Sequence, residues 1–358
     1  MFPSSTPPAP RPDPQPVRFG IIGSGFIAQW FADAVAQESA AQIVAVTSAR
    51  PERARAFAEQ HDVAHAHTSV EDLLSAHGPH SDDPIDVVYI ASPNAFHGEQ
   101  AIAALQAGFH VLVEKPFALN LMEARAMVET ARLANRFLME AWLSAFEPGV
   151  ARLREALPRL GRIHRAVLVK EQFSSRMSAY REGSLPATFD PAMGGGSLMD
   201  LGIYPVNLAI HLFGRPDRVT ASGQLLDSGV DSHGTVVLDY EHGEHSGLQV
   251  VCLHSKTSQG GVDSMIASDH SALVFDDCQW PRRIELHESG SGDQRTENLS
   301  VRRRGAQLRY ELAEVCRLVR SGAHESGLHP LYASEAAVDV LSQARAQTGV
   351  RFPSDPER

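Results

Sequence analysis

The segment Gly23-Ser24-Gly25-Phe26-Ile27-Ala28 constrains the fold of this 358-residue chain most, because it joins a strand pattern to a helix pattern. The run before it, VRFGII, is apolar and β-rich, and the residues after it repeat with helical spacing. Gly23 suits a tight turn, Gly25 lets a ligand approach the backbone, and Ala28 permits close helix–strand packing. The segment predicts a turn that holds the pyrophosphate of a dinucleotide at a helix N-terminus. The alternative is a glycine turn with a structural role only.

Residues 17–139 alternate short β-rich runs with helical patterns, which is typical of a parallel sheet with helices on both faces. Asn120, followed by Glu123, also resembles a capping box at a helix start. The expected strands are Val17–Ile22, Gln42–Thr47, Ile85–Ala91, Phe109–Val113 and Phe137–Met139. The expected helices are Phe26–Glu38, Pro51–His61, Ser69–His77, His97–Ala107 and Asn120–Asn135.

After about residue 162 the pattern changes to β-like runs separated by Gly, Ser, Asp and His turns, which predicts a mostly antiparallel sheet. The open face of such a sheet must be covered, and a second subunit is the simplest cover. The expected strands are Ile163–Phe173, Val219–Leu226, Thr235–Tyr240, Gly247–His254, Ala272–Phe275 and Ile284–His287. The expected helices are Gly196–Leu212, Gln307–Arg320 and Tyr332–Thr348.

Charge and composition limit the partners of the chain. Lys plus Arg is 32 and Asp plus Glu is 43, so the net charge of −11 argues against nucleic acid or a membrane as the main partner. No apolar run approaches the roughly 20 residues of a membrane span. Residues 1–16 hold seven prolines and no signal-peptide pattern, so we expect a disordered proline-rich arm on a cytoplasmic protein. The three cysteines are far apart, which predicts neither a disulfide framework nor a metal site.

The end of the second expected strand bears on the choice of dinucleotide. An acidic residue there would hold the ribose of NAD and repel the additional phosphate of NADP. The chain instead has Ser48 and Arg50, followed by Arg53, and Glu52 comes too late to take that place. Because Arg forms charge-assisted bonds to phosphate, we expect NADP, with NAD as the alternative.

Two further segments place reactive side chains beside the expected cofactor. Lys115 lies in Glu114-Lys115-Pro116 after a strand, where its ammonium would stabilise a developing oxyanion; the alternative is a surface turn. Asp200 and Tyr204 follow a triple glycine and share one face of the expected helix. A lysine nearby would lower the pKa of Tyr204 from about 10, so that the phenol acts as acid or base. A buried structural hydrogen bond is the alternative for this pair.

Together these segments resemble the glucose–fructose oxidoreductase / inositol dehydrogenase (Gfo/Idh/MocA) family. The resemblance runs from about Val17 to Phe352 and looks nearest to the branch of dimeric dihydrodiol dehydrogenase, in which a tyrosine replaces the histidine of inositol-dehydrogenase-like members. The motifs that carry it are VRFGIIGSGFIA, SARPERARAFA, DVVYIASPNAFHGEQAIAALQAGFHVLVEKP, GGGSLMDLGIYPVN and LRYELAEVCRLVRSG.

The resemblance implies an α/β fold in two domains. Residues 17–140 would form an N-terminal Rossmann domain with a parallel sheet. Residues 141–358 would form a C-terminal α/β domain with an open, mostly antiparallel sheet, through which the chain forms a homodimer or a higher homo-oligomer. The last helix would return to pack on one domain or the other.

The resemblance also implies roles for individual residues. Lys115 matches the catalytic lysine, Tyr204 the acid/base and Asp200 the acidic residue that positions substrate and lysine. Two departures are Ala145, where many relatives have arginine, and Ala49, which separates a serine–arginine pair. The expected cofactor-binding residues are Gly23, Ser24, Gly25, Phe26, Ile27, Ser48, Arg50, Arg53, Ser92, Asn94, His97, Glu114 and Lys115.

The sequence therefore predicts an NADP(H)-dependent oxidoreductase that moves hydride to or from a secondary alcohol carbon of a sugar, cyclic polyol or dihydrodiol. The rival interpretation is a non-catalytic NAD(P)-binding regulator of the same fold. A third is an oxidoreductase that keeps its cofactor bound through the cycle.

Overall fold

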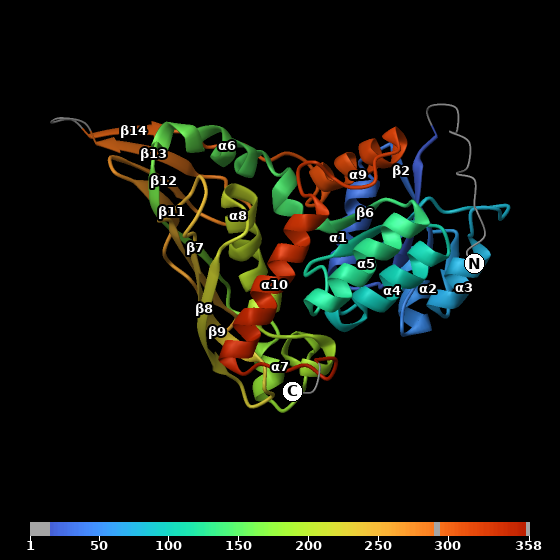
Figure 1. Ribbon diagram of the computed structural model, residues 1–358. Coiled ribbons are helices and arrows are strands. Elements are labelled where there is room, and N and C mark those ends of the chain that lie inside the picture. Colours follow the sequence, from blue (N-terminus) through green and yellow to red (C-terminus); the bar gives the residue numbers. More distant parts are fainter. Residues whose placement is uncertain (1–14, 290–293, 356–358) are drawn as a thin grey trace.

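The computed structural model describes residues 15–289 and 294–355, and its strands form two sheets (Figure 1). The predicted proline-rich arm lies outside the described residues, apart from Gln15 and Pro16. The first sheet has the order β3-β2-β1-β4-β5-β6, and its strand pairs are parallel, as predicted. Its strands are β1 (Val17–Ile22), β2 (Ala41–Thr47), β3 (His65–His67), β4 (Val87–Ile90), β5 (His110–Glu114) and β6 (Leu138–Ala141).

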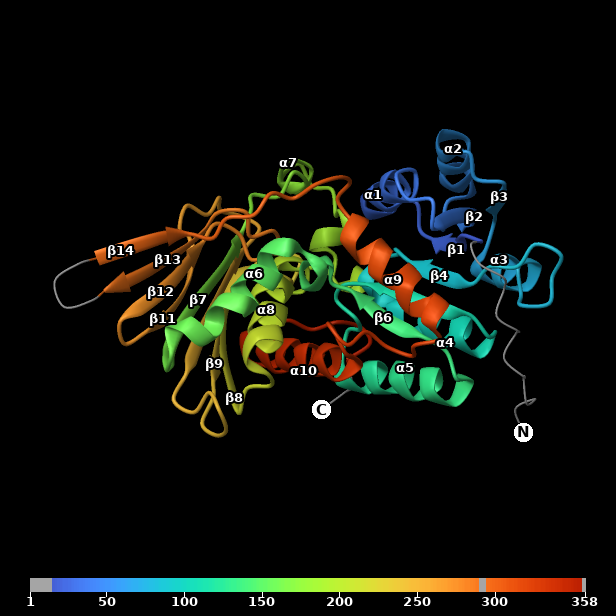
Figure 2. The same ribbon diagram turned by 90° about the horizontal axis from the view of Figure 1, so that it is seen from above.

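Helices cover both faces of the first sheet because its strands bury the side chains on both faces (Figure 2). In β4, for example, Val87 and Tyr89 join one apolar cluster, and Val88 and Ile90 join the other. The helices packed on the first face are α1 (Phe26–Val35), α2 (Pro51–His61) and α9 (Arg309–Ser321). Those on the second face are α3 (Val70–Ala76), α4 (His97–Gln106) and α5 (Leu121–Ala134).

The second sheet has the order β14-β13-β12-β11-β7-β10-β9-β8 and is antiparallel except for the pair β7 and β10. The sequence did not predict β3, β11 or β14. These short strands are polar or lack apolar alternation, and they form because they pair with neighbouring strands. The strands are β7 (Ile163–Glu171), β8 (Arg218–Leu225), β9 (Asp231–Asp239), β10 (Gln249–Ser255), β11 (Ser264–Ser268), β12 (Ser271–Phe275), β13 (Ile284–Ser289) and β14 (Gln294–Asn298).

The helix predicted over Gly196–Leu212 is present, but its first part is π-helical rather than α-helical. A π-helical segment, Leu198–Gly202, comes first, and α8 (Ile203–Phe213) continues from it. The Asp231 carboxylate on β9 accepts a hydrogen bond from Leu198 N at 2.7 Å and so caps the segment. Gly196 has a φ of +120°, and a Cβ there would overlap Asp231 Oδ1, which explains the last glycine of the triple.

The C-terminal helices connect the two sheets. Helix α10 (Leu331–Thr348) packs on α8 and β8, and also on α5 and β6, whereas α9 packs on α1 and β1 (Figure 2). Helices α6 (Pro148–Ala156) and α7 (Met177–Arg181), which the sequence did not predict, lie before and after β7 along the chain. No helix in the described ranges has the length and apolar composition that a membrane span requires.

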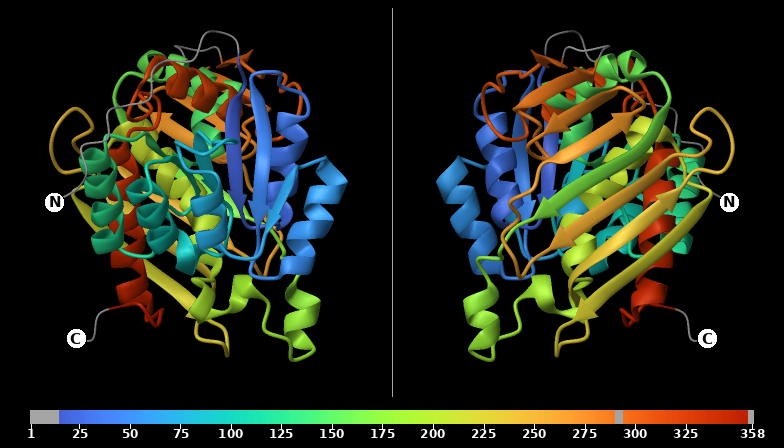
Figure 3. Two further views of the ribbon diagram at one scale, coloured as in Figure 1. Left: turned by 90° about the vertical axis from the view of Figure 1, so that its right-hand side faces the viewer. Right: turned by 90° about the vertical axis from the view of Figure 1, so that its left-hand side faces the viewer.

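The outer face of the second sheet is turned away from the helices (Figure 3, right). A row of half-buried apolar side chains crosses this face from strand to strand in register. The row is Val237, Val251, Val167, Met265 and Val274.

Candidate active site

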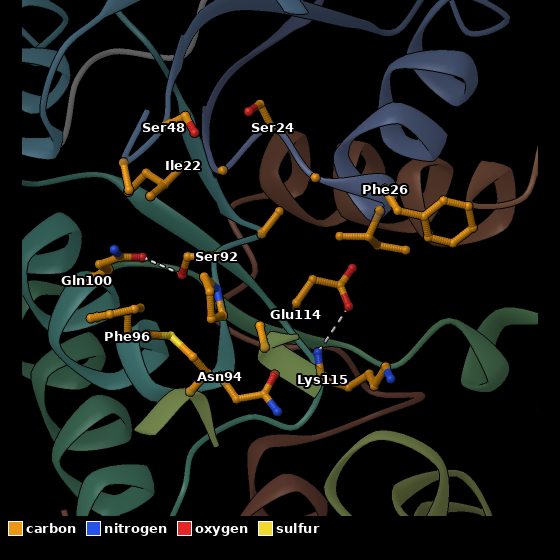
Figure 4. A pocket seen from close by; sticks show the side chains of 18 of the residues that line it. Ile22, Ser24, Phe26, Ser48, Ser92, Asn94, Phe96, Gln100, Glu114 and Lys115 are labelled. Carbon is orange, nitrogen blue, oxygen red and sulfur yellow. Dashed lines mark hydrogen bonds between the residues drawn. The ribbon is translucent and has the colours of Figure 1, made fainter. Parts of the chain in front are cut away.

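A cavity of about 1150 Å³ lies at the carboxyl ends of the first sheet's strands, where β1 is flanked by β2 and β4. Strand order reverses at this point, which is where open α/β sheets bind ligands. The cavity is larger than the roughly 1,000 Å³ at the upper end for single small-molecule sites, so it has room for a cofactor and a substrate. Figure 4 shows Ser24 and Ser48 on one side of the cavity, with Glu114 and Lys115 across from them.

The glycine turn lines one end of the cavity and fits a dinucleotide. Gly23 has a φ of +109°, and a Cβ there would overlap the Ala91 carbonyl oxygen. A Cβ on Gly25 would meet no atom within 4 Å, so this position is open toward the cavity. Helix α1 begins directly after Gly25, without an acidic residue in its first turn, and Ser24, Phe26 and Ile27 line the cavity. The backbone here can receive a pyrophosphate.

The end of β2 gives the same cavity a basic edge. Ser48, Arg50 and Arg53 line it, whereas Glu52 does not. Helix α2 begins at Pro51, which places Glu52 in its first turn, as the sequence indicated.

Ser92, Asn94 and Glu114 line the middle of the cavity. Ser92 Oγ donates to Gln100 Oε1 at 2.7 Å. Asn94 Nδ2 donates to Gly194 O at 2.9 Å and so joins the loop after β4 to the triple glycine. Burial raises the pKa of Glu114 to about 7, although the hydrogen bond from Tyr89 acts in the opposite direction.

His97, predicted to line the cofactor site, is fully buried and does not line the cavity. Its ring nitrogens lie 2.9 Å from Pro116 O and 3.0 Å from Ser92 O, and burial lowers the pKa of its imidazole. His97 therefore supports the two loops that carry Ser92 and Lys115 from behind.

Lys115 and Asp200 form an ion pair between the end of β5 and the π-helical segment. Lys115 Nζ donates to Asp200 Oδ1 and to Asp200 O, both at 2.9 Å. Burial alone would lower the pKa of Lys115, but Asp200 and Tyr204 raise it above its usual value. An ammonium has three donors, so the one that Asp200 does not use is left for Tyr204 or for an oxygen in the cavity.

Tyr204 packs beside this ion pair in α8, with its side chain buried. The ammonium of Lys115 lies 4.8 Å from its ring centroid and that of Lys170 lies 5.6 Å away. Gln279 Nε2 donates to the phenol oxygen at 3.0 Å, which leaves the phenol proton free to be donated. The predicted lowering of the Tyr204 pKa is wrong: burial raises it, and outweighs the opposing effect of Lys115. The phenol of Tyr204 is therefore protonated at neutral pH.

Sequence reasoning missed four residues of this region: Gln279, Trp280, Lys170 and Lys256. The first two line the cavity, Lys170 pairs with Asp277, and Lys256 is ion-paired with Asp200. One signal was available, because the full sequence contains three lysines and all of them gather here.

The parallel sheet and the glycine turn are those of an NAD(P)-dependent oxidoreductase, and the family and relatives below show action on CH–OH groups. Residues 17–141 match the model of the oxidoreductase family with an NAD-binding Rossmann fold, and residues 152–265 match the GFO/IDH/MocA C-terminal domain. The chain belongs to the GFO/IDH/MocA family, as its sequence motifs indicated.

Two curated relatives match along nearly the whole chain. The chain is 36% identical to scyllo-inositol 2-dehydrogenase (NADP(+)) of Bacillus subtilis, over 95% of this chain and 99% of that protein. It is 31% identical to the Homo sapiens trans-1,2-dihydrobenzene-1,2-diol dehydrogenase, with the same coverage of 95% and 99%. Among solved structures, a 3-ketoreductase from Actinomadura kijaniata in complex with NADP shares the fold, with a TM-score of 0.75, 21% identity and coverage of 93% and 98%.

The glycine turn yields a prediction with a matched pair of variants. Gly23→Ala should lower the free energy of unfolding by about 2 kcal/mol or more, because its positive φ and the Ala91 carbonyl both oppose a Cβ. Gly25→Ala should keep the wild-type melting temperature and weaken NADPH binding by about tenfold, since its Cβ points into open space. Calorimetry and fluorescence titration measure the two effects. Unchanged NADPH affinity in Gly25→Ala would show that the pyrophosphate binds elsewhere.

Proposed function

We propose that this protein is an NADP(H)-dependent oxidoreductase that transfers hydride to or from a secondary alcohol carbon of a sugar, cyclic polyol or dihydrodiol. The observation that carries the proposal is the convergence of Lys115, Asp200 and Tyr204 at one end of the cavity that the glycine turn lines. The names of the relatives support the substrate class, since they specify a scyllo-inositol and a dihydrodiol dehydrogenase.

The proposed cofactor site lies in residues 17–140 and the proposed substrate site in residues 141–358. The turn Gly23–Ile27 would hold the pyrophosphate, and Ser48, Arg50 and Arg53 would hold the additional phosphate of NADP. Ser92, Asn94, Glu114 and Lys115 would lie along the nicotinamide half, with His97 behind them. The bound nicotinamide supplies the hydride or accepts it.

The remaining chemistry is proton transfer and charge stabilisation by the chain's own residues. The one donor of Lys115 that Asp200 does not use would bind the reacting oxygen and stabilise its negative charge. In reduction, Tyr204 would give its phenol proton to that oxygen; in oxidation, its phenolate would remove the proton. Asp200 would keep the ammonium directed at the oxygen.

Lys115→Met and Tyr204→Phe should each lower turnover by about 10²-fold or more, because each removes a donor to the reacting oxygen. NADPH affinity should change by less than about threefold, since the glycine turn and the β2 end carry most of the cofactor binding. Absorbance of NADPH with a panel of sugars, inositols and diols measures turnover, and titration measures affinity. Cofactor binding with no turnover of any panel member by the wild type would favour the regulator instead.

The same assay checks the protonation state of Tyr204. Because its pKa is raised, the phenolate fraction should grow by about tenfold per pH unit between about pH 7 and 10, and turnover in oxidation should rise with it. Reduction, which uses the protonated phenol, should stay flat over this range. Tyr204→Phe should remove the rise.

Arg50 should determine the choice of NADP over NAD. Arg50→Ala removes a guanidinium that lines the cavity at the β2 end, so the KM for NADPH should rise by about tenfold while the KM for NADH changes little. Steady-state kinetics with both nucleotides measures the ratio. A wild-type protein that uses NADH as well as NADPH would contradict the assignment of this edge to a phosphate.

We infer that a second copy of the chain covers the outer face of the second sheet, because its row of apolar side chains is contiguous across five strands. Val251→Asp, at the centre of the row, should shift a dimer toward monomer, since it would bury an unpaired charge at the interface. Leu133→Asp, on the exposed side of α5, should leave the oligomer unchanged. Light scattering after gel filtration measures both, and a monomeric wild type would contradict the inference.

A further inference from the structure

The distribution of lysine in this chain is unusual. The full sequence contains Lys115, Lys170 and Lys256, and every other basic side chain apart from histidine is arginine. The exposed fractions of these three lysine side chains are 14%, 8% and 4%. Lysine is almost never buried unless it is paired, and each of these has a carboxylate partner. Because lysine is otherwise a surface residue, its confinement to this region indicates a role in the site.

Lys256 is the most buried of the three and has no assigned role so far. It follows β10, and its backbone is fixed on both sides: its N–H donates to Ser232 O and its carbonyl accepts from Ser174 N, both at 2.9 Å. Its ammonium donates to Asp200 Oδ2, and Thr188 Oγ1 lies 3.4 Å from the same oxygen. Lys256 does not line the cavity, so it can act on a ligand only through Asp200.

The two oxygens of Asp200 are therefore divided between two lysines. Oδ1 accepts from Lys115 and Oδ2 accepts from Lys256. Without Lys256, Asp200 could rotate away from Lys115, and the charge of the remaining pair would be zero. With Lys256 these three groups carry one net positive charge, of which nearby Asp231 offsets a part, and the remainder favours negative charge on an oxygen bound to Lys115.

We propose that Lys256 is a positioning residue of the hydride-transfer reaction, holding Asp200 toward Lys115 and leaving the group with a net positive charge at the reacting oxygen. The inference rests on the function proposed above. Lys256 follows a strand of the second sheet, does not line the cavity and belongs to no sequence motif.

Lys256→Met, which is similar in length and uncharged, tests the proposal. Turnover should fall by about 10- to 100-fold with NADPH affinity unchanged, because the variant removes a charge and an orienting bond but no cofactor contact. Oxidation should fall by about tenfold more than reduction at each pH between about 7 and 10, since loss of a nearby cation raises the pKa of the Tyr204 phenol and lowers its phenolate fraction. Lys256→Arg should restore turnover in part and return the ratio of oxidation to reduction to its wild-type value. If the Met variant does not fold, Lys256→Gln repeats the loss of charge.

Arg345→Met is the matched control, because Arg345 is also a buried cation, 3% exposed, and pairs with Asp355 outside the cavity. It should lower the melting temperature and leave the pH profile unchanged. In an Asp200→Asn background, Lys256→Met should have little further effect, because its partner charge is gone.

Wild-type turnover and pH profile in Lys256→Met would overturn the proposal. So would an equal loss of oxidation and reduction with no recovery in Lys256→Arg, which would mean a structural role only. If Lys115→Met also kept wild-type turnover, the proposed function itself would have failed, and the two outcomes are thereby distinguished.

Discussion

The ion pair between Lys115 and Asp200 is the contact on which the arrangement of this cavity depends. It joins the end of β5 in the first sheet to the π-helical segment that packs on the second sheet. Other contacts hold the chain on both sides of the pair, so the surrounding structure sets how Lys115 and Asp200 face each other. On one side, Glu140 accepts from Phe117 N at 3.1 Å, and His97 supports the Pro116 carbonyl. Because Glu140 also accepts from Ser334 of α10, the C-terminal helix helps to hold the loop of the lysine.

The other partner is held by charges that are costly to bury. Asp231, which caps the π-helical segment, is buried, and burial raises its pKa to about 6. The hydrogen bond from Leu198 N and the charge of Lys256 offset only part of this desolvation, so the ionised Asp231 opposes folding at neutral pH. Capping by Asp231 therefore lowers the stability of the fold, and the capped segment fixes the direction of Asp200. Such a cost is typical of functional rather than purely structural polar groups.

Local signals predicted the first half of the chain well, and tertiary contacts explain most of what they missed. The glycine turn, five strands and five helices follow from patterns within a few residues, and Asn120 caps α5 through Glu123 N at 2.9 Å as expected. Lys256 and Gln279 could not be found this way, because each lies after a strand with no motif around it. The predicted direction of the Tyr204 pKa shift was wrong for a related reason. A neighbouring lysine is visible in a motif, but the degree of burial is a property of the packed chain.

The protonation states of the buried acidic groups determine the net charge around Lys115. Glu114 and Glu311 are both buried near the cavity, and burial raises the pKa of each: Glu114 to about 7, and Glu311 well above its usual value. Carboxyl groups that are wholly or partly neutral at physiological pH offset less of the charge of Lys115 than ionised carboxylates would. Asp200 is held ionised by Lys115 and Lys256 against its own desolvation, and it directs the ammonium of Lys115. Under the proposed function, a protonated phenol and a directed ammonium would favour donation to an oxygen, so the site at rest would suit reduction, and oxidation would require a proton to leave first.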